Sequence, residues 1–219
     1  MNSSSVRGLY VLADDDPRWP CDPVEQARAA LAGGASVIQL RAKHTTDRQA
    51  LAWAESIRDL CRTSSALFFV NDRFDLALAA RADGVHLGQD DLSPAKIPEP
   101  VRGRLRIGRS THTLEQARAA CEEPLDYVAF GPVFGTTSKT SPYDARGLDA
   151  LAAVAQLVRP RPCVAIGGID EGRAADVLRA GASALCVLSA VMAAPDMERA
   201  TRSLVSAIAR ASAVAPTTP

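Results

Sequence analysis

Residues 36–43 read SVIQLRAK, an apolar strand that ends in polar side chains. Side chains alternate between the two faces of a strand, so Gln39, Arg41 and Lys43 are predicted to share one side. The lysine stands out because the chain has 25 lysines and arginines, nearly all of them arginines. A compact ammonium at a strand end suits a phosphate, and the plain alternative is a solvated strand terminus. These residues alone leave both interpretations open.

The same unit, a short apolar strand followed by a helix rich in alanine, leucine and arginine, recurs along the chain. Strands are predicted at 9–13, 37–40, 67–70, 84–87, 105–108, 127–130, 164–166 and 185–188. Helix starts are indicated at 22–23, 46–47 and 170–171, and helix ends at 33–34 and 181. Eight alternating units predict one parallel (β/α)8 TIM barrel, and they disfavour the alternative of an open doubly wound sheet.

Length and composition predict a single domain. The chain has 219 residues, 47% of them hydrophobic, and no linker rich in proline, glycine or serine divides it. We expect the barrel to span residues 8–211, with disordered tails at 1–7 and 212–219. The formal net charge is zero, so neither nucleic acid nor an anionic membrane is expected as a partner, and any anion site must be local.

The cysteines and the N-terminus indicate the cellular compartment. Five cysteines, odd in number and widely spaced, predict reduced buried thiols rather than disulfides. No CxxC or Cys/His ligand spacing favours a structural zinc. The first seven residues lack an apolar signal core, and no apolar run approaches membrane-spanning length. A cytoplasmic protein is therefore expected.

Polar residues gather after the predicted strands, where barrel enzymes carry their chemistry. These are Arg41, Lys43, Asn71, Asp72, Gln89, Asp90, Asp91, Ser110, His112, the loop 131–147, Gly167, Gly168 and Ser189. The opposite ends of the strands offer no comparable cluster. This asymmetry predicts an active site at one mouth of the barrel.

Two aspartates at adjacent strand ends, Asp72 and Asp91, predict a metal site. Paired carboxylates near basic side chains, bridged by an anionic substrate, are suited to Mg²⁺. The alternative is that Asp72 caps a helix starting at Arg73 and Asp91 caps one near Ser93. Each residue taken singly favours the cap, whereas the two together favour the metal.

Two turns predict a phosphate seat: Gly167-Gly168 after the seventh strand and Leu188-Ser189 after the eighth. Backbone N–H groups and helix N-termini bind phosphate at this place in many barrels, and glycine lets the backbone approach the ligand. The loop 131–147 is longer than a usual connection and rich in hydroxyls. We expect it to act as a lid that brings Lys139 over a phosphate.

The remaining polar residues near the mouth receive weaker assignments. His86 lies within a strand and is expected to be a hydrogen-bonded interior residue, whereas His112 is an acid/base candidate. The run 14–16 of three aspartates is interpreted as a solvated loop, and His44 has no assigned role.

Together these motifs resemble the thiamine phosphate synthase family, in the family's order, over residues 8–208. The matching stretches are QLRAK at 39–43, VNDR at 70–73, GVHLGQDD at 84–91, GRSTHT at 108–113, GPVF at 131–134, AIGGI at 165–169 and LSA at 188–190. Two places depart from the family: Ser138 replaces the second threonine of Thr-x-Thr-Lys, and Leu12-Ala13-Asp14 replaces Val-Thr-Asp.

The resemblance implies a transferase of thiamine biosynthesis. It would condense a hydroxymethylpyrimidine diphosphate with a carboxythiazole phosphate, giving thiamine phosphate, diphosphate and CO₂ by Mg²⁺-assisted dissociative displacement. By resemblance, the pyrimidine diphosphate would be held by Gln39, Leu40, Arg41, Ala42, Lys43, Asn71, Ser110 and Lys139, with Arg41, Lys43, Ser110 and Lys139 serving catalysis. The thiazole phosphate would be held by Thr136, Thr137, Ser138, Gly168, Leu188 and Ser189, and Mg²⁺ by Asp72 and Asp91.

Two other functions stay open. A thiazole tautomerase of the same superfamily would move a proton with His112 and would need neither diphosphate-binding cations nor Mg²⁺. A non-catalytic barrel that binds a phosphate ligand would keep the phosphate seat without turnover. The retained Arg41, Lys43, Asp72, Asp91 and Lys139 disfavour the tautomerase. The intact pair Asp72 and Asp91 disfavours the non-catalytic barrel. The expected partners are small-molecule substrates, and the sequence does not decide whether the protein forms a homo-oligomer.

Overall fold

The computed structural model describes residues 5–135 and 143–214. Within these ranges, parallel strands pair in chain order and β1 pairs with β8, which closes the sheet into a barrel. The strands are β1 (Gly8–Asp14), β2 (Val37–Arg41), β3 (Leu67–Asn71), β4 (Gly84–Leu87), β5 (Arg106–Thr111), β6 (Tyr127–Phe130), β7 (Cys163–Ile166) and β8 (Ala184–Val187). The predicted (β/α)8 barrel is confirmed, and the open doubly wound sheet is excluded.

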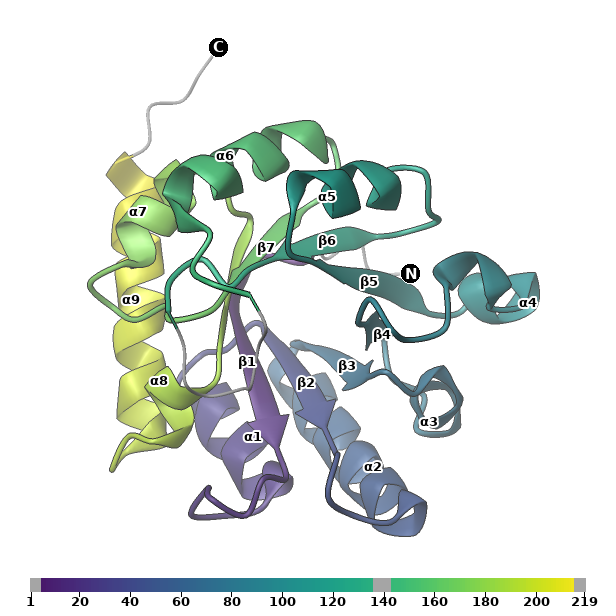
Figure 1. Cartoon of the computed structure of the whole chain (residues 1–219). Helices are drawn as coiled ribbons and strands as arrows, with labels where there is room; N and C mark the ends of the chain where they lie inside the picture. Colours follow the sequence, from purple (N-terminus) through teal and green to yellow (C-terminus); the bar gives the residue numbers. More distant parts are fainter. Residues whose placement is uncertain (1–4, 136–142, 215–219) are drawn as a thin grey trace.

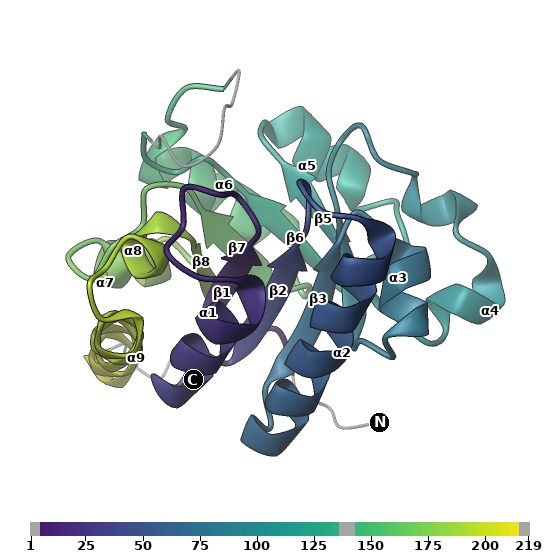
Figure 2. The ribbon, with the colours of Figure 1, turned by 90° about the horizontal axis from the view of Figure 1, so that it is seen from below.

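Helices surround the barrel on its outside (Figures 1 and 2). They are α1 (Pro23–Ala32), α2 (Asp47–Ser64), α3 (Phe74–Ala79), the short 3₁₀ helix η1 (Pro94–Lys96), α4 (Glu99–Arg102), α5 (Leu114–Ala120), α6 (Gly147–Leu157), α7 (Ala174–Arg179), α8 (Ser189–Met192) and α9 (Met197–Val214). The last helix, α9, packs beside α7, α8 and α1 and contacts β1, so it covers the place where the barrel closes (Figure 1).

Side-chain caps explain why the first two helices start where the sequence predicts. The Asp22 side chain accepts two first-turn N–H groups of α1, and the Thr46 hydroxyl accepts one of α2. Such a cap stabilises a helix by about 1 kcal/mol. The third predicted start lies too early, because the Asp170 side chain accepts from the N–H of Arg173 and α7 begins only at Ala174.

Two strand boundaries differ from the prediction and matter for the site. Strand β5 was expected at 105–108 but runs from Arg106 to Thr111, because Ser110 and Thr111 pair with β6. Ser110 is therefore a strand residue and not a loop residue. Strand β8 ends at Val187, so Leu188 lies in the turn before α8.

Aromatic rings fill part of the barrel interior. The rings of Tyr10, Phe69 and Tyr127 pack together with centroid distances of 5.5 to 6.2 Å. Glycines on the neighbouring strands make this room, because a Cβ atom on Gly84 would clash with Phe69 and one on Gly108 with Tyr127. Burying a large side chain contributes about 1.5–3 kcal/mol, so the small residues stabilise the core by admitting large ones.

The barrel extends slightly beyond the predicted limits of 8–211. Val6 is buried, and α9 continues to Val214, because Leu204 and Ile208 bury its inner face against the barrel. Residues 1–4 and 215–219 of the two predicted tails lie outside the described residues. Among the residues that are described, no helix combines the length and the apolar run needed to cross a membrane.

The cysteines agree with the prediction of thiols in the interior. Within the described ranges none of the five forms a disulfide, and Cys61, Cys163 and Cys186 are buried. Burial raises the pKa of the Cys61 and Cys163 thiols to about 12. Cys21 and Cys121 are only partly covered.

Candidate active site

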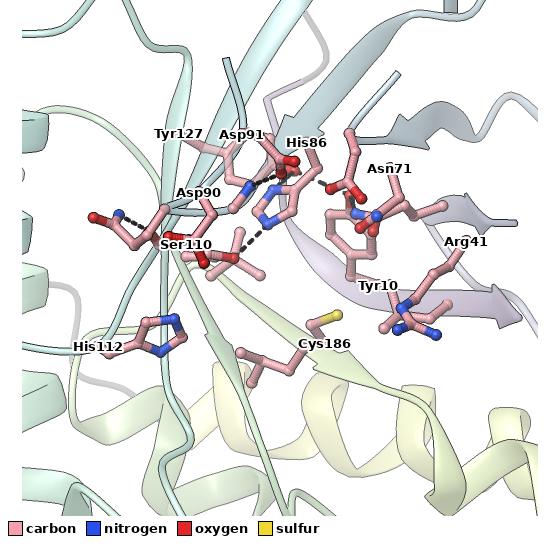
Figure 3. Close-up of a pocket in the computed structure, with 18 of the residues that line it drawn as sticks. Tyr10, Arg41, Asn71, His86, Asp90, Asp91, Ser110, His112, Tyr127 and Cys186 are labelled. Carbon is pink, nitrogen blue, oxygen red and sulfur yellow. Dashed lines mark hydrogen bonds between the residues drawn. The ribbon is translucent and has the colours of Figure 1, made fainter. Parts of the chain in front are cut away.

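A cavity of about 500 Å³ opens at the C-terminal ends of the barrel strands, the mouth that the sequence predicts. Side chains from strands around the whole barrel point into it (Figure 3). Its lining includes Gln39, Arg41, Lys43, Asn71, Asp72, Asp90, Asp91, Ser110 and His112, together with Tyr10, His86, Tyr127 and Cys186. The structure thus gathers at one mouth the polar residues that follow separate strands.

Gln39, Arg41 and Lys43 face this cavity together, as strand alternation predicts. Leu40 and Ala42 lie between them in the sequence and do not line it. Leu40 is buried in the hydrophobic core, and Ala42 packs against that core. Of the residues 39–43 proposed for the pyrimidine diphosphate, only the alternate three bring their side chains to the cavity.

Arg41 is held in place by a buried carboxylate. Asp14, at the end of β1, lies opposite Arg41 in the register of β1 and β2. Its Oδ2 accepts a hydrogen bond from Arg41 Nη1 at 2.7 Å, and Asp14 is only 1% exposed. The Gln26 side chain fixes the backbone of Asp14 from below, accepting from its N–H and donating to its carbonyl. The guanidinium has five N–H donors, so this ion pair leaves most of them for another anion.

The prediction that residues 14–16 form a solvated loop is wrong. Asp14 is a buried strand residue, and the carboxylate of Asp15 accepts from the backbone N–H groups of Lys43 and His44 at 2.7 and 2.8 Å. The reason is the register of β1 against β2, which sets these aspartates beside the segment that follows β2. The acidic run therefore orders the segment that carries Lys43.

Asp72 and Asp91 bring their carboxyl groups together, with Lys43 beside them. Burial and the hydrogen-bonding contact with Asp91 raise the pKa of Asp72, against the opposing effect of Lys43. The Lys43 ammonium forms an ion pair with Asp72, and Asp91 Oδ2 accepts from the N–H of Gly88 at 2.6 Å. Two carboxyl groups this close resist joint ionisation, and a divalent cation between them would offset that repulsion. The donor set therefore fits Mg²⁺.

The alternative of two helix caps is wrong. The N-cap of α3 is Arg73, without a side-chain cap, and Asp72 has a φ of 62°, a left-handed conformation that aspartate tolerates. The helix η1 follows Ser93 and is likewise not capped by a side chain. Among the described residues no group of three or more histidine, cysteine or acidic side chains could hold a metal.

His86 is an interior residue, as predicted, and it holds Ser110. Its Nδ1 lies 2.8 Å from the Tyr127 hydroxyl and its Nε2 lies 2.8 Å from Ser110 Oγ (Figure 3). Gln89 Nε2 donates to the carbonyl oxygen of Ser110 at 2.5 Å. Both the side chain and the backbone of Ser110 are therefore fixed at the cavity wall.

His112 lies across the cavity from Arg41 (Figure 3). Its Nδ1 is 2.6 Å from the carbonyl oxygen of Gly131, which can only accept, so Nδ1 carries a proton. The ring stacks on Tyr143 with a centroid distance of 4.1 Å. His112 stays an acid/base candidate by position.

A smaller hollow of about 60 Å³ lies where the phosphate seat is predicted, lined by Gly167, Gly168, Leu188 and Ser189 among others. Gly167 and Gly168 have φ values of 102° and 62°, a region that residues with a Cβ atom rarely adopt. A Cβ atom on Gly168 would lie 2.5 Å from the carbonyl oxygen of Gly135. Leu12, Ile166 and Cys186 line both hollows, so the two adjoin.

Four of the predicted site residues, Thr136, Thr137, Ser138 and Lys139, lie outside the described residues. The prediction of a lid over 131–147 depends on them and stays a prediction. The described start of this segment is bonded to the glycine turn: the N–H of Phe134 donates to the carbonyl of Gly167 at 3.0 Å.

A protein-family model described as thiamine monophosphate synthase matches residues 9–191. The chain belongs to the thiamine monophosphate synthase family. It is 46% identical over 214 residues to the thiamine-phosphate synthase of Anaeromyxobacter dehalogenans (strain 2CP-C), covering 97% of this chain and 92% of the relative. The thiamine-phosphate synthase of Chloroflexus aurantiacus is 45% identical over 196 residues, covering 90% of each chain.

A solved structure agrees with this family membership. Thiamine phosphate pyrophosphorylase from Pyrococcus furiosus superposes with a TM-score of 0.84 at 39% identity, covering 93% of this chain and 96% of that chain. The resemblance found in the sequence is therefore confirmed at the level of family and fold. As a member of this family, the chain is an enzyme, a transferase of thiamine biosynthesis.

Among the residues of the site that sequence reasoning missed are Asp14, Tyr10 and Tyr127. Tyr10, Leu12 and Asp14 are alternate residues of β1, so their side chains share one face of the strand. The strand was predicted from its run of apolar residues, without separating the face that points into the barrel. Reading that alternation to its end would have placed Asp14 inside the barrel. Tyr127 begins β6 and gives no such signal by itself, because a tyrosine at the start of a strand is common at either face.

Proposed function

We propose that this enzyme joins 4-amino-2-methyl-5-hydroxymethylpyrimidine diphosphate to a carboxythiazole phosphate, forming thiamine phosphate, diphosphate and CO₂. The observation that carries the proposal is the cluster at the cavity wall, where the cations Arg41 and Lys43 meet the carboxyl pair Asp72 and Asp91. Cations and paired acids side by side suit a diphosphate and a divalent metal bound together. The family membership supports the same reaction.

The chain's cations would neutralise the diphosphate as it leaves. The bond between the methylene carbon and the diphosphate oxygen breaks, and its electron pair stays on the oxygen. Arg41, oriented by Asp14, and Lys43, whose backbone Asp15 holds, are placed to stabilise the charge that develops there. Lys139 would join them.

Mg²⁺ fits the carboxyl pair and would be held by Asp72 and Asp91 with phosphate oxygens and water completing its shell. When bound, it supplies further charge neutralisation at the leaving diphosphate. The Lys43 ammonium, which pairs with Asp72, would add its positive charge beside this site.

Gln39, Asn71 and Ser110 would hold the pyrimidine ring and the diphosphate, while the glycine hollow anchors the thiazole phosphate. The electron-rich aminopyrimidine stabilises the cation left behind. The thiazole nitrogen then forms the new carbon–nitrogen bond, CO₂ leaves from the thiazole carboxylate, and a proton from water replaces it on the ring carbon to complete the product. Two anchored reactants in one cavity react as if intramolecular. No strong general base is needed, because the attacking thiazole nitrogen uses a lone pair and carries no proton that must be removed.

A thiazole tautomerase is the second candidate, and it rests on His112. A tautomerase needs one proton carrier beside the thiazole and has no use for a carboxyl pair next to cations. The retained Asp72, Asp91, Arg41 and Lys43 therefore favour the transferase.

The test is to mix the protein with both substrates and Mg²⁺ and to assay diphosphate and thiamine phosphate, with and without a chelator. We expect both products, and we expect the chelator to abolish them. A rearranged thiazole without diphosphate would establish the tautomerase instead. Saturable binding of both phosphates without any product would establish a non-catalytic barrel.

A further inference from the structure

Five polar side chains form one continuous line of hydrogen bonds across the barrel interior. Gln39 Nε2 donates to the Tyr10 hydroxyl at 2.6 Å, and the Tyr10 and Tyr127 hydroxyls lie 3.0 Å apart. The Tyr127 hydroxyl lies 2.8 Å from Nδ1 of His86, whose Nε2 lies 2.8 Å from Ser110 Oγ. The line runs from β2 to β5, and both of its ends lie at the cavity wall.

The donors available fix the direction of these bonds. The amide nitrogen of Gln39 can only donate, so the Tyr10 oxygen accepts and the Tyr10 proton turns elsewhere. Among the described residues, the other hydrogen-bond partner of that hydroxyl is Tyr127. Having accepted from Tyr10, the Tyr127 hydroxyl directs its own proton to Nδ1 of His86. Burial raises the pKa of both phenols well above the ordinary value, so both keep the protons that this sequence of bonds requires.

We propose that this line of hydrogen bonds runs in one direction and fixes His86 as the neutral tautomer with its proton on Nε2. His86 then donates to Ser110 Oγ, and the Ser110 hydroxyl turns its own proton toward a ligand. At the other end, Gln39 keeps its carbonyl oxygen for a ligand. The cavity therefore offers an acceptor from β2 and a donor from β5. Tyr10 and Tyr127 are positioning residues, since they act through Gln39, His86 and Ser110.

Because the side chains are buried, all the hydrogen bonds in this line must point in the same direction. Tyr10, Tyr127 and Gln39 are 1%, 0% and 2% exposed, so water has little access to replace a lost partner. The opposite direction requires every bond to reverse. The Gln39 amide would accept, His86 would carry its proton on Nδ1, and Ser110 would donate to His86. The two ends of the line therefore change together across the barrel.

The identity of the ligand at these two ends rests on the proposed function, which places a pyrimidine diphosphate there. The tautomer of His86 does not rest on it, because it is a property of the protein without substrate. A failure of the proposed reaction would leave the tautomer measurable, and a failure of the tautomer would leave the reaction untouched.

The decisive measurement is long-range ¹H–¹⁵N NMR of the full chain labelled at its histidines, without substrate. The chain has three histidines, and single His44→Gln and His112→Gln variants identify the His86 signals by elimination. We expect Nε2 at the shift of a protonated nitrogen and Nδ1 at that of an unprotonated one. The reverse order, or a doubly protonated ring, overturns the proposal.

Two variants test whether the line transmits direction. Gln39→Glu, measured where the ¹³C shift shows the new carboxyl to be ionised, replaces the first donor with an acceptor, so the His86 proton should move to Nδ1. Tyr127→Phe removes the hydrogen bond from the Tyr127 hydroxyl to Nδ1, so the preference for the tautomer protonated on Nε2 should weaken. Phe69→Leu is the matched control, because it disturbs the same ring cluster without breaking a hydrogen bond, and it should leave the His86 signals in place. If the His86 tautomer were unchanged in Gln39→Glu, the direction of the hydrogen bond at Gln39 would not determine which nitrogen of His86 carries the proton.

Discussion

The two sides of the cavity are built by different means. On the side of β1 to β4, side chains face the cavity, and a carboxylate holds each of two cations: Asp14 holds Arg41, and Asp72 pairs with Lys43. On the side of β7 and β8, glycine turns form a hollow whose shape comes from the backbone. Binding on the first side should therefore depend on side-chain charge, and binding on the second side on the volume left free by the glycines. Substitutions that change only charge or only volume should distinguish the two sides.

The largest effect is expected on the charged side, from Asp72→Ala. Loss of this carboxylate removes half of the acidic pair, so Mg²⁺-dependent diphosphate release should fall about 100- to 1000-fold, as when one preorganised electrostatic group is removed. The rate of diphosphate release, assayed at a series of Mg²⁺ concentrations, would measure this loss.

The matched control is Asp75→Ala, three residues away, where the carboxylate is exposed and bonded to Arg73 outside the cavity. It should release diphosphate at nearly the rate of the unmodified chain. Unchanged release in Asp72→Ala, with the thermal unfolding midpoint preserved, would contradict the assigned role.

The backbone side is tested by Gly168→Ala. The new Cβ atom would lie 2.5 Å from the Gly135 carbonyl oxygen in the hollow, so the KM for the thiazole phosphate should rise about 10- to 100-fold, which corresponds to about 1.4–2.7 kcal/mol. The KM for the pyrimidine diphosphate should change little. Steady-state kinetics with each substrate varied in turn would show the difference.

Gly147→Ala separates backbone strain from lost volume. Gly147 also has a positive φ, 80°, but a Cβ atom there would meet nothing within 4 Å. Both variants should lose about 1–2 kcal/mol of unfolding free energy from the left-handed conformation. If the two raised the KM equally, strain and not the volume of the hollow would be responsible.

A smaller effect is expected from Asp14→Asn, which keeps the shape of the side chain and removes the charge that orients Arg41. The kcat/KM for the pyrimidine diphosphate should fall about tenfold, equivalent to about 1.4 kcal/mol of lost orientation. The KM for the thiazole phosphate should stay the same, since that site depends on the backbone. Equal losses toward both substrates would remove the distinction between the two sides.

The smallest effect is expected from Asp16→Asn, two residues along the same acidic run. Hydrogen bonding to Arg18 lowers the pKa of Asp16 to about 2, so the pair contributes to stability only where the carboxyl is ionised. A lowered folded-state pKa gives stability above the usual aspartate pKa of about 3.9, and this is lost as the pH falls toward 2.

The Arg18 side chain is 49% exposed, so solvent screening keeps this contribution slight, and activity should be unchanged. Denaturant unfolding of Asp16→Asn and the unmodified chain should differ at neutral pH and converge in acid. A difference in unfolding free energy between the two proteins that increased below pH 4 would contradict this predicted pH dependence.

The two sides also differ in how far the sequence predicted them. All eight strands were predicted, because each is a short apolar run and the barrel repeats the unit. Gln39, Arg41 and Lys43 were placed on one face by alternation alone, and Gly167-Gly168 by its position after the seventh strand. Each of these features depends on one short segment, so the residues of that segment are enough to predict it.

The features that sequence reasoning missed depend on register between segments. Asp14 was taken for part of a solvated loop because its burial comes from the pairing of β1 with β2. Ser110 was placed after β5, although pairing with β6 keeps it in the strand. The contact of Asp72 with Asp91 joins residues on two loops, and the Tyr10–Tyr127 contact joins strands more than a hundred residues apart in the chain.

The glycines at 84 and 108 determine how the barrel interior is closed beneath the cavity. By admitting the rings of Phe69 and Tyr127, they let the barrel axis be plugged beneath the cavity. Tyr10 and Tyr127 also line the cavity, so these rings form its floor, and we expect a substrate to enter from the mouth at the C-terminal strand ends.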